Sequence, residues 1–172
     1  LYNLYNTKDE LLLEALRDLL VISYQRVGEM SELGPGWKHL LNVMEYGAAL
    51  RASEPAYAEA ITDALLRAVQ GDALTELLLR GVRQDFLLSL AKMAERGELK
   101  KEVDVEHLAT ILLGNYWSTF MMINKGLEVI SRMRVSLLVN LLSVLIASSQ
   151  GAARDEMETT LEEIRQEVQS NA

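Results

Sequence analysis

The chain has 172 residues, of which 49% are apolar and 24% charged, so it is long enough to bury the core of one domain. Its net charge of −8 makes the residues present a poor surface for phosphate, and the absence of cysteine excludes disulfides, thiolate nucleophiles and thiolate metal sites. Leu, Ala and Glu recur throughout, without the alternation typical of a half-buried strand. We therefore expect an all-α protein with no sheet.

The first predicted helix runs from about Lys8 to Met30. Thr7 is a suitable N-cap, and Glu10 follows three residues later, in the reciprocal arrangement that satisfies two free amide groups. The sequence Gly34-Pro35-Gly36 then ends the helical pattern.

Six further helices are predicted in chain order, giving about seven in all. Pro55 stands near the start of the third, where its missing amide hydrogen costs nothing, and Asp104 is expected to cap the fifth. The last carries one apolar stripe with spacings of three and four residues. The expected ranges are about 37–52, 56–70, 73–96, 104–125, 128–148 and 153–168.

Two apolar runs, 108–123 and 135–147, are interrupted by polar residues. Both fall short of the roughly 20 apolar residues that a membrane span needs. Together with the absence of cysteine, they predict the buried helices of a soluble, cytoplasmic protein.

The first dozen residues, Leu-Tyr-Asn-Leu-Tyr-Asn-Thr-Lys-Asp-Glu-Leu-Leu, resemble a junction in the TetR family of bacterial transcriptional regulators. In that family a recognition helix ends in a Leu-Tyr pair, followed by an aromatic residue, a short turn, a lysine and an acidic-leucine helix start. The segments 94–99 and 103–109, before an apolar helix that ends near Lys125-Gly126, resemble the family's link between a long pocket helix and the first dimer helix. The order and lengths of the predicted helices are similar to its C-terminal domain.

The resemblance implies that residues 1–8 are the end of an N-terminal helix-turn-helix DNA-binding domain, the rest of which lies upstream of Leu1. Residues 9–172 would be the effector-binding and dimerisation domain. Tyr2 and Lys8 match family positions that touch DNA phosphates, contacts that position a protein without reading bases. The implied protein is a ligand-responsive regulator, expected to be a repressor, which binds operator DNA as a homodimer and is released by a small, mostly apolar effector.

A ligand cavity is expected among the central helices, because large apolar and adaptable side chains gather there with few polar ones. Asn115 is a candidate orienting group within it. Ordinary core packing is the alternative for each of these residues taken singly. The candidate lining residues are Tyr24, Trp37, Met44, Phe86, Met93, Asn115 and Phe120.

The sixth predicted helix is apolar on two sides, which predicts that one side faces the chain's own core and the other a partner. Small residues spaced by four on the fifth helix permit close helix approach, so two helices from each chain would form a four-helix dimer interface. The alternative is a monomer whose seventh helix covers the second side. The expected interface residues are Thr110, Gly114, Ser118, Val135, Leu138, Val139, Leu142, Leu145 and Ile146.

No motif in the sequence indicates catalysis. The run Asp104-Val105-Glu106-His107 offers at most half of a helical metal site, and the serines lie on predicted helices without a nucleophile turn. We expect no enzyme, no metal and no cofactor. A stand-alone helical module for protein-protein interaction, without DNA binding, is the main alternative, and a small helical enzyme or metal protein is a third.

Overall fold

The computed structural model describes residues 11, 14, 15, 17, 34–67 and 73–170. Within these residues all regular elements are helical and no strand forms, which confirms the all-α prediction. Leu11, Glu14, Ala15 and Arg17, which fall in the first predicted helix, are helical. Arg17 and Glu14 form an ion pair one turn apart, at 3.4 Å.

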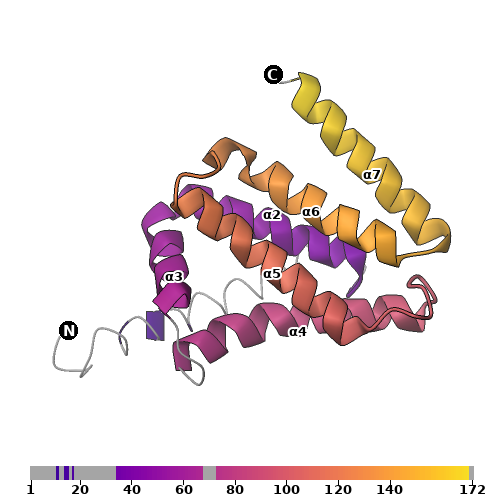
Figure 1. Ribbon diagram of the computed structural model, residues 1–172, viewed down its shortest axis with the longest axis horizontal. Helices are drawn as coiled ribbons and strands as arrows, with labels where there is room; N and C mark the ends of the chain where they lie inside the picture. Colours follow the sequence, from indigo (N-terminus) through magenta and orange to yellow (C-terminus); the bar gives the residue numbers. More distant parts are fainter. Residues whose placement is uncertain (1–10, 12–13, 16, 18–33, 68–72, 171–172) are drawn as a thin grey trace.

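The remaining helices follow the predicted order (Figure 1). They are α2 (Trp37–Ser53), α3 (Pro55–Arg67), α4 (Ala73–Glu95), α5 (Val105–Asn124), α6 (Met133–Ser148) and α7 (Gly151–Ser170). All but one of the predicted ends lie close to the observed ones. The exception is the start of α6, expected near Glu128, because a 3-10 turn, Ile130–Arg132, comes before it.

The two ends of the α4–α5 loop are fixed by local chemistry. Gly97 adopts a φ of 72°, which brings the Glu98 amide to the Met93 carbonyl at 2.9 Å and ends α4. At the other end, the Asp104 carboxylate accepts a hydrogen bond from the His107 amide at 3.1 Å, which confirms the predicted N-cap of α5.

The core forms around α6, which packs against α2, α5 and α7, while α4 packs against α5 (Figure 1). The hydrophobic cluster includes Phe86 and Leu90 of α4 and Leu142 and Leu145 of α6, all fully buried. The helix α7 contributes its predicted apolar stripe, of which Met157, Leu161 and Ile164 are buried.

One segment of the described chain, Ile130–Ser148, is long and apolar enough to cross a membrane by length and composition, with a mean hydropathy of 1.6. The prediction that the apolar runs are too short did not count the residues of the 3-10 turn that precede α6. Core helices of soluble proteins pass the same test. In this chain the segment has three helices packed against it.

Arg134 links three helices through charge. From α6 its Nε donates to both Glu45 oxygens of α2, at 3.0 and 2.8 Å, and its Nη1 donates to Glu167 of α7, at 3.1 Å to the nearer oxygen. The hydrogen bond that the guanidinium donates to Glu45 raises its pKa above the usual value, with Glu167 adding to the shift. The C-terminal half of α7 is therefore held to the body by charge as well as by its apolar stripe.

Arg134→Gln is expected to lower the free energy of unfolding by about 1 kcal/mol, because the bridge is partly exposed and such pairs contribute little more. The loss should shrink in 1 M salt, which screens exposed charges. Urea unfolding measures the loss of unfolding free energy at low and at high salt. Arg134→Lys is the control that keeps the charge but loses the bidentate geometry. An equal loss of unfolding free energy at both salt concentrations would contradict an electrostatic role for Arg134.

Candidate functional site

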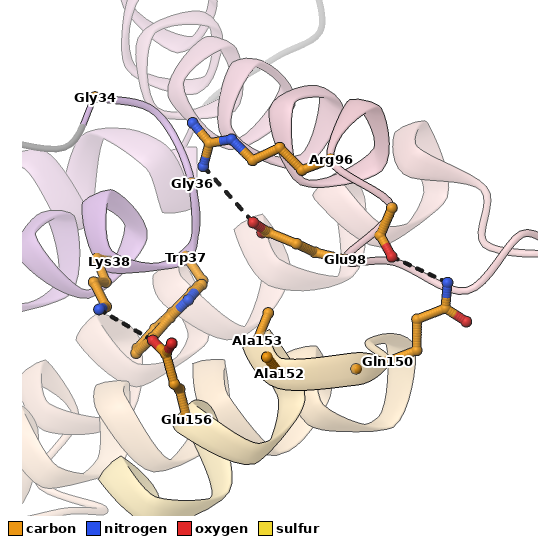
Figure 2. A pocket seen from close by; sticks show the side chains of 12 residues that line it. Gly34, Gly36, Trp37, Lys38, Arg96, Glu98, Gln150, Ala152, Ala153 and Glu156 are labelled. Carbon is orange, nitrogen blue, oxygen red and sulfur yellow. Dashed lines mark hydrogen bonds and ion pairs between the residues drawn. The ribbon is translucent and has the colours of Figure 1, made fainter.

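An open pocket of about 380 Å³ lies where the first turns of α2 and α7 meet the loop after α4 (Figure 2). Four glycines among its lining residues leave backbone groups uncovered. Its lining residues are Gly34, Gly36, Trp37, Lys38, Arg96, Gly97, Glu98, Gln150, Gly151, Ala152, Ala153 and Glu156.

The wall of this pocket is held by a backbone clamp between two loops, an antiparallel bridge that pairs Leu99 with Ser149. The Lys100 amide donates to the Ser148 carbonyl at 3.0 Å, and the Gln150 amide donates to the Glu98 carbonyl at 2.8 Å. The Gln150 side chain adds a bond to the Gly97 carbonyl at 3.0 Å (Figure 2). The sequence does not predict this clamp, because Leu99 and Ser149 lie far apart in the chain.

The charges in the pocket balance. Lys38 pairs with Glu156 at 3.1 Å and Arg96 with Glu98 at 3.8 Å (Figure 2). Neither α2 nor α7 has an acidic residue in its first turn, so their amide ends contribute partial positive charge. Because the side-chain charges cancel and backbone groups line the pocket, it suits weak binding of a small polar molecule.

The predicted ligand residues are distributed over two regions. Trp37 lines the open pocket, whereas Phe86 and Phe120 each contact Tyr116, with ring centroids 6.3 and 5.0 Å apart. Tyr24 lies outside the described residues. Trp37, Met44, Phe86, Met93 and Phe120 are all buried in the hydrophobic core.

Met44 and Asn115 meet at a narrow gap between α2, α5 and α6, where Asn140 and Tyr116 also lie. The gap encloses about 180 Å³ of space between atoms but has no room for a water-sized sphere. Asn115 is half-buried on the side of α5 that faces α6. In this conformation the gap is too narrow for a ligand, and the effector cavity stays a prediction.

The predicted interface residues divide into three groups by exposure. Thr110, Gly114 and Ser118 of α5 are exposed. On α6, by contrast, Leu138, Leu142 and Leu145 are buried within this one chain, so they cannot form part of a partner-facing surface. Half of the α6 residues expected to face a partner are therefore packed within the chain itself. Val135, Val139 and Ile146 are half-buried.

The histidines do not gather into a metal site. Among the described residues, no group of three or more His, Asp, Glu or Cys side chains could hold an ion. His39 Nε2 lies 3.9 Å from the Asp85 carboxylate, and His107 is exposed in the first turn of α5.

Among the described residues six polar side chains have a buried atom with no hydrogen-bond partner, and three of the six lie on α2 and α5. They are Arg51 at the end of α2, and Trp117 and Asn124 in the second half of α5. In the sequence Asn124 precedes Lys125-Gly126 and resembles an ordinary helix end. Only the packing of the helices shows that these polar atoms are buried without a hydrogen-bond partner.

No protein-family model matches the chain, and no curated protein or solved structure matches it either. The helical architecture and the residues above therefore carry the functional argument.

Proposed function

We propose that the chain is the effector-binding and dimerisation part of a TetR-type bacterial regulator, acting in the cytoplasm as a ligand-released repressor. The TetR-like junction in residues 1–12 and the TetR-like link in residues 94–109 support this assignment. The observed order of helices is compatible with it, since a long α4 leads through a capped loop into the apolar helix α5.

Gly114 is the observation that carries the proposed homodimer. It lies in the middle of α5, and a Cβ built on it would meet nothing within 4 Å. A glycine in a helix interior costs about 1 kcal/mol relative to alanine, and no contact within the described chain requires one here. Its neighbours one turn away, Thr110 and Ser118, are small and exposed. Close approach of a helix from a second copy would account for the missing side chain.

In the proposed mechanism two copies pair through the outer faces of α5 and α6, which sets the spacing of two DNA-reading domains. An effector that binds one arrangement of the dimer more tightly than the other shifts the population away from the operator-compatible form. Half-site spacing on the DNA follows from the two-fold symmetry of such dimers.

The test uses the protein with its preceding N-terminal segment and selection of duplexes from a random pool. We expect a palindromic site to be enriched. Lys8→Ala should weaken binding to the selected and to a scrambled duplex by similar factors and flatten the salt dependence slightly, because a phosphate contact carries no base information. A change of base preference with unchanged salt dependence would contradict the placement of Lys8, and failure to enrich any duplex would refute the regulator.

A stand-alone interaction module is the second candidate, and one surface favours it. The turn between α5 and α6 exposes large apolar side chains, with Leu127 73%, Val129 57% and Ile130 49% exposed. Exposed apolar patches of this kind mark contacts with other proteins. A chain that selects no DNA but whose oligomeric state depends on these three residues would support this reading.

A further inference from the structure

The junction of α2, α3 and α5 contains buried polar atoms that the chain itself does not satisfy. They are Arg51 Nε, Trp117 Nε1 and both amide atoms of Asn124, and none of them has a hydrogen-bond partner. A buried polar atom without a partner costs about 1–3 kcal/mol, so native proteins keep few of them. Several in one region indicate that something else completes their bonding.

Helix geometry brings these atoms to one region. Trp117, Phe120 and Asn124 are spaced by three and four residues, so they share one side of α5. Asn115 faces α6 and lies about 200° around the helix from Trp117, which places this side of α5 away from α6. The helix α3 packs against both α5 and α2.

Arg51 joins this region from α2. It lies one turn beyond Gly47, and a Cβ on Gly47 would come within 2.7 Å of the Tyr116 hydroxyl of α5. Both α2 and α5 run toward α3 (Figure 1), and α3 packs against both of them. No ion pair involves Arg51 within the described part of the chain.

The surroundings are aromatic. The Trp117 ring lies 5.0 Å from that of Tyr116 and 5.7 Å from that of Phe120, measured between centroids. From α3, Tyr57 is half-buried, and burial raises the pKa of its hydroxyl well above the ordinary value, with Tyr46 adding to the shift.

The unsatisfied atoms are mostly donors: one guanidinium nitrogen, one indole nitrogen and one amide nitrogen, against one amide oxygen. We propose that this junction is the polar end of the effector site and binds an apolar molecule that carries a carboxylate. The two carboxylate oxygens accept from Arg51, Trp117 and Asn124, and the apolar part lies against Phe120. This inference rests on the proposed function, because it names the chemical class of the effector.

The same atoms have almost no contact with solvent in the structure. A carboxylate can therefore reach them only if the packing around them opens. The ligand then binds the opened arrangement and not the closed one, which is the differential affinity that a population shift requires.

The probes are 3-phenylpropanoate, 4-phenylbutyrate and octanoate, each compared with its primary amide by calorimetry on the unaltered protein. We expect at least one acid to bind, and its amide to bind at least ten-fold more weakly. In Trp37→Phe, which leaves Trp117 as the single tryptophan, the same acid should shift the fluorescence emission. Equal binding of acid and amide, or no binding by any acid at millimolar concentration, would overturn the proposal.

Variants then test the named residues. Arg51→Gln and Asn124→Ala should each weaken the acid at least ten-fold, whereas Asn140→Ala, at the gap on the other side of α5, should leave its affinity unchanged. Asn124→Leu should also raise the melting temperature of the ligand-free protein, since it removes an unsatisfied group. A lower melting temperature would show that Asn124 has a structural bond and would refute its place in the site.

The result of the acid-binding test and the result of the DNA-selection test can be told apart. If acids bind as described but the longer protein selects no DNA, the site stands and the regulator fails. If DNA is selected but no acid binds, the regulator stands and this inference fails.

Discussion

Replacing Gly114 with arginine is expected to convert a dimeric protein into folded monomers. A long, charged side chain would stand where the proposed partner helix approaches most closely, and burying an unpaired charge there is unfavourable. We expect the dimer dissociation constant to rise at least 100-fold, which corresponds to about 2.7 kcal/mol. Within one chain the substitution meets open space, so it should not disturb the fold.

Sedimentation at micromolar concentration measures this change, and circular dichroism measures the fold. The isolated chain should gain about 1 kcal/mol of helix stability, because glycine is the poorer helix former. Gln84→Arg, at an exposed position of α4, adds the same charge elsewhere and should leave the dimer intact. The dimer proposal fails if wild-type protein sediments as a monomer, or if the Gly114 variant remains a dimer.

Gly47→Leu is expected to have the largest effect on the fold itself. Gly47 is buried in α2, and the nearest atoms to a Cβ at this position are the Tyr116 hydroxyl at 2.7 Å and ring carbons at 3.1 and 3.3 Å. Tyr116 is itself buried and surrounded by other rings. A leucine would therefore separate α2 from α5, with a loss of about 3 kcal/mol or more from overpacking.

A smaller variant isolates the contact responsible. Gly47→Ala should be destabilising in the wild-type background and less so in Tyr116→Phe, because the nearest atom is then gone while the ring carbons at 3.1 and 3.3 Å remain. The coupling in this double-mutant cycle should be about 1 kcal/mol. Additive effects of the two substitutions on urea unfolding would show that Tyr116 does not set the requirement for glycine.

These two glycines illustrate how far the sequence could predict the structure. Both lie in the interior of a helix, and the spacing of apolar residues alone gives no means of telling them apart. One lies against a tyrosine of its own chain and the other against nothing. Helix positions and the Asp104 cap were predictable because they depend on neighbours in sequence, whereas the reason for each glycine depends on which helix lies opposite.

The start of α6 lies later than predicted because Gly126 turns the chain and the Glu128 side chain accepts from the Val129 amide. Of the α6 residues predicted to face a partner, Leu138, Leu142 and Leu145 are covered by the chain itself. An apolar face predicts that something covers it and does not say what.

Residue type alone does not separate a core from a ligand cavity, because large apolar side chains line both equally well. Phe86, Met93 and Phe120 are buried, as either role requires. The polar atoms of Trp117 and Asn124 carry more information, because a core does not need them. Their lack of partners becomes visible only when the packing is known.

The backbone bridge between Leu99 and Ser149 has a mechanical consequence. The helices α5 and α6 are joined at one end by their connecting turn, and the bridge fastens the loops at the opposite end, so the hairpin becomes a closed frame. A frame closed at both ends resists shear between its two long sides. A displacement of the α4–α5 loop would then move α5, α6 and the start of α7 together as one rigid body.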